Sequence, residues 1–177
     1  FAVVTVGEGV GYAYAVHGQV VDHHDAGVGT VGHLPLDPSG PLCPLGHAGC
    51  ADAMLSTASI TTRASVAHGR QLHRDEVYDL AEAGDPVCRR VVDDSARALG
   101  RLVATVGALV MPRKVIISGE GVRLAEVGAA ALEAALAEHR SPRATPLDVE
   151  VQVTGFAEWA RGAAVTAIRT FVLGEGL

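Results

Sequence analysis

One long amphipathic helix in the second half of the chain does most to constrain the fold. It begins at Asp85-Pro86, because Asp accepts free backbone N–H groups as an N-cap and Pro suits the first helical position. Apolar residues then recur at helical spacing until Met111, and Pro112 ends the pattern. The apolar stripe consists of Cys88, Val92, Ala96, Leu99, Val103, Val106 and Val110. Such a stripe predicts a helix packed on a core.

Short β-branched runs lie on both sides of this helix. Residues 2–6 and 114–118 predict buried strands, residues 10–16 and 19–21 predict a hairpin around His17-Gly18, and residues 149–153 predict a further strand. Helical patterns cover about 51–57, 75–83, 124–139 and 157–172. Strands followed by helices that alternate with strands predict an α/β fold.

Composition limits the classes of protein to which the chain can belong. With 49% apolar and 19% charged residues it can bury a core, and no apolar run has transmembrane length. A net charge of −6 without a basic cluster argues against direct binding of nucleic acid. The chain lacks an initiator Met and a signal peptide, so we expect a piece of a longer protein. Three cysteines without an export signal favour the cytoplasm.

Two glycine-rich turns follow predicted strands. The first turn is Gly7-Glu8-Gly9-Val10-Gly11, and the second is Gly119-Glu120-Gly121 after the strand that ends at Ser118. Glycines let backbone N–H groups approach phosphate oxygens closely, and a strand-to-helix junction suits an anion. Such turns are also common structural devices, so both interpretations stay open.

A long turn-rich loop, residues 23–50, contains a candidate metal site. Its potential ligands are His33, Cys43 and Cys50, with His47 as a possible fourth. Zinc takes four nitrogen or sulfur ligands, and it commonly stabilises loops with little apolar content. The spacing leaves zinc and a metal-free loop both open. His23 and His24, next to Asp22 and Asp25, are better explained as a solvated turn than as a metal site.

The order of these motifs resembles the C-terminal half of the ROK family, which contains repressors, open reading frames and sugar kinases. The resemblance covers the whole chain, residues 1–177, through the first glycine turn, Gly32-His33, the Cys/His knuckle at about 23–50, Asp85-Pro86, the second glycine turn and Arg161-Gly162-Ala163-Ala164. It implies the C-terminal lobe of the actin-like ATPase (ribonuclease H-like) fold, a mixed sheet flanked by helices. The N-terminal lobe, with the catalytic Asp, and any DNA-binding domain would then lie outside this chain.

The chain departs from the family pattern at several positions. Glu8 replaces the Thr of the phosphate turn, and Glu120 replaces a glycine of the second turn, so two carboxylates argue against ATP binding. In the sugar motif, Thr30 replaces a Glu and Asp52 stands where Glu is usual, while His33 is kept. In the zinc motif, Leu45 replaces the middle Cys.

The resemblance implies three alternative functions. We expect the effector-binding and dimerisation part of a ROK transcriptional regulator, similar to xylose and N-acetylglucosamine repressors. A sugar or sugar derivative would bind near His33, Asp52 and Thr30, the glycine turns would be vestigial, and a homodimer would reach DNA only through a domain outside this chain. The alternatives are half of an ATP-dependent, glucokinase-like ROK sugar kinase and a degenerate oligomerisation scaffold. We expect no membrane partner.

Overall fold

The computed structural model describes residues 1–25 and 28–174. Its centre is a five-stranded sheet in the order β3-β2-β1-β4-β5. The strands are β1 (Ala2–Val6), β2 (Val10–Val16), β3 (Gln19–Val20), β4 (Lys114–Ser118) and β5 (Asp148–Val151). The pairs β1–β2 and β2–β3 are antiparallel, whereas β4 runs parallel to β1 and to β5. The sheet is therefore mixed, as expected.

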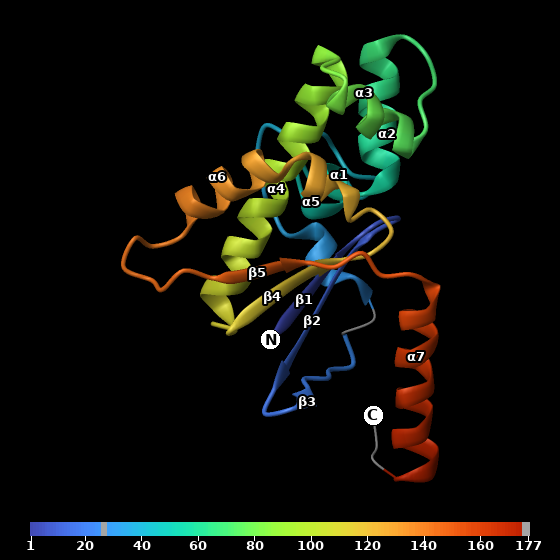
Figure 1. Ribbon diagram of the computed structural model, residues 1–177, viewed down its shortest axis with the longest axis vertical. Coiled ribbons are helices and arrows are strands. Elements are labelled where there is room, and N and C mark those ends of the chain that lie inside the picture. Colours follow the sequence, from blue (N-terminus) through green and yellow to red (C-terminus); the bar gives the residue numbers. More distant parts are fainter. Residues whose placement is uncertain (26–27, 175–177) are drawn as a thin grey trace.

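The long helix α4 (Pro86–Leu109) crosses one face of the sheet together with α6 (Ala129–His139), as Figure 1 shows. Asp85 caps α4 by accepting the Cys88 N–H, and Leu99, Leu102 and Val103 are completely buried in the core. Gly100 lets α4 and α6 approach closely, because a Cβ there would collide with the Leu132 carbonyl oxygen. The predicted α4 thus forms the second layer.

Several predicted helix boundaries were wrong. The segment expected at 51–57 is α1 (Ala51–Leu55), and it is followed by a second helix, α2 (Thr57–His68), that was not predicted. Ser56 separates them with extended backbone, and its hydroxyl accepts the Ser59 N–H of α2. Helix α2 is rich in Thr, which has low helix propensity, and it is stabilised by burial of Ile60 and Ala64. Helix α3 (Arg74–Glu82) lies close to its expected position.

The remaining differences lie toward the C-terminus. The helix expected at 124–139 is divided at Gly128 into α5 (Arg123–Val127) and α6. A Cβ at Gly128 would collide with Ala96 of α4, so this junction requires glycine. The last strand is Asp148–Val151 rather than 149–153. Helix α7 (Phe156–Ala167) and the π-helical turn η3 (Ile168–Val172) lie beside the sheet in Figure 1, and neither has a buried residue. Arg169 Nη2 of η3 donates to Gln19 Oε1 of β3 at 2.7 Å.

No helix among the described residues combines the length and apolarity needed to cross a lipid bilayer.

Candidate functional site

The two glycine turns meet at one end of the sheet. Strands β1 and β4 are parallel neighbours, with Thr5 opposite Ser118, so their carboxyl ends lie side by side. The Gly121 N–H donates to the Val6 carbonyl oxygen at 2.9 Å. Gly119 has a φ of +103°, and a Cβ there would collide with the same Val6 oxygen. These backbone contacts therefore hold the second glycine turn, residues 119–121, against the end of β1, where the first glycine turn, residues 7–11, begins.

The side chain of Glu120 lies in the first turn. Its Oε1 accepts the Glu8 backbone N–H at 3.1 Å. A Cβ on Gly7 would overlap the Glu120 carboxyl group, so the glycine makes room for this contact. The hydrogen bond from the Glu8 N–H is the main reason why the pKa of Glu120 is lowered. The first glycine turn thus binds an anion, and that anion is a carboxylate of the same chain.

This contact gives a pH-dependent prediction. The pKa of Glu120 is lowered from its ordinary value of 4.5, so its stabilising effect is complete above that value and is lost as the pH falls through the folded-state pKa. Because Glu120 is exposed, we expect a contribution of only about 0.3 kcal/mol. The measurement is the amide proton shift of Glu8 against pH, with an expected midpoint below 4.5. A midpoint at or above that value, or an unchanged curve in Glu120→Gln, would contradict the contact.

Asp52 lies in the first turn of α1, directly after the Cys43–Cys50 knuckle. Its Oδ1 accepts the Val10 N–H at 3.2 Å. Its carboxyl group also lies against Gly32, where a Cβ would come within 2.6 Å of Oδ2. Asp52 therefore connects the hairpin to the 3-10 turn η2 (Thr30–His33).

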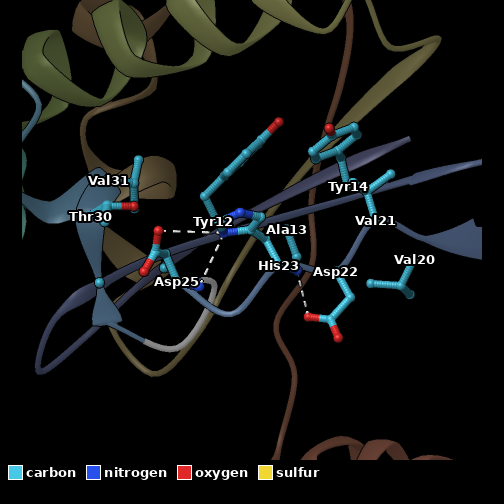
Figure 2. A pocket seen from close by; sticks show the side chains of 12 residues that line it. Tyr12, Ala13, Tyr14, Val20, Val21, Asp22, His23, Asp25, Thr30 and Val31 are labelled. Carbon is cyan, nitrogen blue, oxygen red and sulfur yellow. Dashed lines mark hydrogen bonds and ion pairs between the residues drawn. The ribbon is translucent and has the colours of Figure 1, made fainter. Parts of the chain in front are cut away.

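The three residues predicted to bind an effector do not line a single cavity. Asp52 lines a cavity of about 310 Å³ between the knuckle and helices α1 and α2. Thr30 lies at the edge of a second cavity of about 520 Å³, shown in Figure 2. His33, in η2, is not among the residues that line either cavity.

The second cavity contains an aromatic pair that was not among the predicted site residues. The rings of Tyr12 and Tyr14 are stacked with centroids 5.7 Å apart, and Figure 2 shows them with Thr30 and Val31. The spacing of two along β2 was the available signal, because it puts both side chains on the same face of the strand. Burial raises the pKa of Tyr12. Asp22, His23 and Asp25 complete one side of this cavity.

All four predicted metal ligands converge in the knuckle. His33 Nδ1 is 3.9 Å from the sulfur atoms of both Cys43 and Cys50, and His47 Nδ1 is 3.7 Å from the Cys43 sulfur. One ligand atom from each residue lies within 4.8 Å of the others. Two thiols and two imidazoles form a donor set that suits zinc, so the residues fit this ion. Leu45 is 67% exposed and offers no ligand atom.

The two knuckle thiols have different environments. Burial alone would raise the pKa of Cys43, but the neighbouring backbone N–H groups of His47, Leu45 and Gly46 lower the pKa. Burial raises the pKa of Cys50. The third thiol, Cys88, is buried in α4, and burial raises its pKa to about 11.

The other histidine cluster is an exposed turn, as expected. His23 Nδ1 and His24 Nε2 lie 3.4 and 3.5 Å from the Asp25 carboxylate, and all three side chains are more than half exposed. Ligand atoms of these residues also lie close enough for a metal ion, but exposed acidic groups commonly do so without one.

Comparisons with known proteins identify the family. The ROK family model matches residues 1–170. The chain is 33% identical over 137 residues to N-acetylmannosamine kinase of Escherichia coli O139:H28, covering 76% of this chain and 46% of that protein. It is 30% identical over 176 residues to N-acetylmannosamine kinase of Escherichia coli O7:K1, covering 98% and 57%. The chain thus spans about half the length of the curated relatives it matches.

Solved structures agree with the fold. ROK hexokinase from Thermus thermophilus matches with a TM-score of 0.71 and 26% identity, over 85% of this chain and 50% of that one. A ROK family transcriptional regulator, a homolog of the Escherichia coli MLC protein, matches with a TM-score of 0.71 and 22% identity, over 86% and 41%. The predicted family and its actin-like fold are both confirmed. The chain belongs to the ROK family.

Proposed function

We propose that this chain is the effector-binding and dimerisation part of a ROK transcriptional regulator that binds a sugar without phosphorylating it. The observation that carries the proposal is the hydrogen bond from the Glu8 N–H to the Glu120 carboxylate. A backbone donor of the first glycine turn is thereby already occupied. A phosphate group would have to displace this carboxylate, and it would meet the second carboxylate of Glu8.

The repulsion between a phosphate group and these carboxylates is large enough to weaken ATP binding. Two like charges at contact distance repel by about 1 kcal/mol in the dielectric of water and by about 4 kcal/mol in that of a protein surface. Phosphoryl transfer depends on donors placed around the phosphates, so losing the Glu8 N–H removes part of that machinery as well. Both effects disfavour ATP at this turn.

The proposed effector is an N-acylated hexosamine, because the curated relatives described above are N-acetylmannosamine kinases. Asp52 offers a carboxylate oxygen to sugar hydroxyl groups. His33 directs Nδ1 toward the two thiols, which leaves Nε2 as the ring nitrogen available to a ligand. A hydrogen bond to the Asp52 carboxylate contributes about 1.5–3 kcal/mol, and one to the neutral His33 ring contributes about 0.5–1.5 kcal/mol.

Ligand binding would act through a population shift in a homodimer of the cytoplasmic protein. An effector that prefers one arrangement of the lobes stabilises that arrangement and repositions DNA-binding domains outside this chain. The contacts of Asp52 with both the hairpin and η2 support the idea that the site is connected to the rest of the lobe.

A second candidate function is an ATP-dependent sugar kinase. The observation that favours it is the 33% identity to N-acetylmannosamine kinase over 76% of the chain. In that case, the base that accepts the sugar hydroxyl proton would lie outside this chain.

One experiment separates the two candidates. The full-length protein is incubated with N-acetylmannosamine or glucose and ATP, and phosphoryl transfer and thermal stability are measured in parallel. We expect N-acetylmannosamine to raise the melting temperature, since a ligand at 100 times its Kd stabilises by about 2.7 kcal/mol. We expect no phosphorylated sugar and no ATP-induced shift. Turnover with either sugar would establish the kinase instead.

The role of Glu120 has its own test. Glu120→Gly removes the internal carboxylate, and we expect the affinity for ATP to rise about tenfold, which corresponds to about 1.4 kcal/mol of relieved repulsion. Glu8→Thr is the matched variant, because it removes a nearby charge but keeps the Glu120 contact with the backbone N–H. A rise only in Glu8→Thr, or in neither variant, would show that Glu120 does not block the turn.

A further inference from the structure

We infer that the tyrosine-lined cavity of about 520 Å³, which lies between β2, β3 and η2, binds an organic ammonium ion. The ligand would be a small molecule that carries a positive charge on an apolar body, in contact with two aromatic rings and two carboxylates. Neither Asp52 nor His33 lines this cavity, so it is separate from the proposed effector site. The inference therefore does not depend on whether the protein is a regulator or a kinase.

One wall of the cavity is aromatic and is carried by a strand in the middle of a ladder. The rings of Tyr12 and Tyr14 are stacked with centroids 5.7 Å apart. Tyr12 lies opposite Val4 of β1 and Tyr14 lies opposite Ala2, and both of these partners are completely buried. The tyrosines are only partly buried, so each packs on the core and still lines the cavity, as Figure 2 shows. The aromatic wall is therefore present before a ligand binds.

The segment after β3 supplies negative charge to the same cavity. Asp22 and Asp25 both line it, on either side of His23 in Figure 2. Asp22 Oδ1 accepts the His23 N–H at 2.8 Å, and His23 Nδ1 accepts the Asp25 N–H at 3.1 Å. An imidazole nitrogen that accepts an N–H carries no proton, so His23 is neutral in this arrangement. No lysine or arginine is among the described residues that line the cavity, and its charge is therefore negative.

The rings and the carboxylates together select the charge of the ligand. Aromatic faces attract cations through the ring quadrupole, and aromatic side chains commonly recognise quaternary ammonium groups in this way. Nearby carboxylates add a Coulombic attraction for a cation, whereas they repel an anion. A neutral ligand of the same shape would gain neither effect. The cavity thus favours a cation over both alternatives.

The size and the remaining lining favour a molecule with an apolar body. Ligand pockets commonly have volumes of about 300–1,000 Å³, and this cavity falls in that range. Val20, Val21 and Val31 offer apolar surface, and the Thr30 hydroxyl offers a hydrogen bond. Choline combines a quaternary ammonium group, methyl groups and a hydroxyl group. It is therefore a suitable probe for this site.

The test uses the full-length protein and choline. The matched control ligand is the neutral alcohol in which carbon replaces the choline nitrogen, because the two molecules share their shape and differ in charge. Titration calorimetry measures both affinities, and saturation-transfer NMR detects contact between ligand methyl groups and aromatic protons of the protein. We expect choline to bind about tenfold more tightly than the alcohol, with transfer to its methyl groups. Added salt should weaken the binding of choline alone.

Substitutions in the cavity test the two walls separately. Tyr14→Leu removes one ring, and we expect the affinity for choline to fall about fivefold, whereas Tyr14→Phe keeps the ring and should bind choline normally. Asp22→Asn removes one negative charge and should also lower the affinity about fivefold. Glu133→Gln is the matched control for charge, because Glu133 is exposed on α6, and it should leave the affinity unchanged.

Other results would overturn the inference. Equal affinities for choline and the neutral alcohol would show that the cavity does not recognise charge. Unchanged choline binding in Tyr14→Leu or in Asp22→Asn would place the ligand elsewhere, and an equal loss in Glu133→Gln would reduce the effect to the net charge of the protein. Displacement of choline by N-acetylmannosamine would make this cavity the effector site instead. If Tyr14→Leu does not fold, the exposed Asp22 still provides the decisive variant.

Discussion

Gly119→Ala is expected to lower the free energy of unfolding by about 2–6 kcal/mol. Gly119 has a φ of +103°, a backbone conformation that side chains with a Cβ rarely adopt, and such strain costs about 1–3 kcal/mol. The new Cβ would also collide with the Val6 carbonyl oxygen, which already accepts the Gly121 N–H. Overpacking against atoms that cannot move adds about 1–3 kcal/mol. Urea denaturation of both proteins provides the measurement.

Gly84→Ala is the matched control for this prediction. Gly84 has a similar φ of +89°, but a Cβ there meets nothing within 4 Å. Gly84→Ala should therefore lower the free energy of unfolding only by the cost of the backbone conformation, without the cost of a collision. If the two variants lose the same stability, the close approach of β1 and the second glycine turn does not constrain the fold.

Local signals predicted those parts of the fold that are determined within one segment. Asp85-Pro86 located the start of α4 correctly, because the cap and the first turn involve neighbouring residues. The β-branched runs predicted β1 and β4 at their observed bounds. Helix α2 and the break at Gly128 could not be predicted, since both depend on contacts with α4. Helix propensity is a local property, and it does not predict which other helix a segment will pack against.

The candidate site was likewise predictable only where it depends on residue types and not on contacts between distant segments. The knuckle ligands could be identified from their residue types, and the structure brings all four together. Glu8 and Glu120 were recognised in the sequence as two charges unfavourable for ATP. The contact between the Glu120 carboxylate and the Glu8 N–H could not be predicted, because the two residues lie far apart in the sequence. That contact exists because parallel pairing of β1 and β4 aligns the two turns. The separation of Thr30 and Asp52 into different cavities was equally invisible in the sequence.

The contacts of Asp52 suggest how ligand binding would affect the lobe. Asp52 holds the Val10 N–H at the start of β2 and lies against Gly32 in η2. The Thr57 N–H of α2 donates to the Gly7 carbonyl oxygen at 2.7 Å, so the helix after Asp52 also contacts the first glycine turn. An effector bound at Asp52 would therefore act on the hairpin and on the glycine turn together.

His33→Ala is expected to weaken binding of both zinc and the effector. His33 Nδ1 faces the two thiols, so its loss should lower zinc affinity ~100-fold, since even partners that only orient a ligand contribute about 10–100-fold. Loss of the Nε2 hydrogen bond, which is made by a neutral ring, should lower affinity for N-acetylmannosamine by about 2-fold to 12-fold, corresponding to about 0.5–1.5 kcal/mol. Chelator competition and titration calorimetry measure the two effects separately. Normal sugar binding in a zinc-depleted His33→Ala protein would contradict the role of His33 in the effector site.

Asp52→Asn should separate the two effects, because Asn still accepts the Val10 N–H but has no charge. We expect unchanged zinc content and an affinity for N-acetylmannosamine that is about tenfold lower, since a neutral hydrogen bond is weaker than a charged one by about 1–1.5 kcal/mol. Asp25→Asn is the control, because Asp25 lines the other cavity with Tyr12 and Tyr14. If Asp25→Asn weakens sugar binding and Asp52→Asn does not, the effector binds in the tyrosine-lined cavity, and the assignment of Asp52 is wrong.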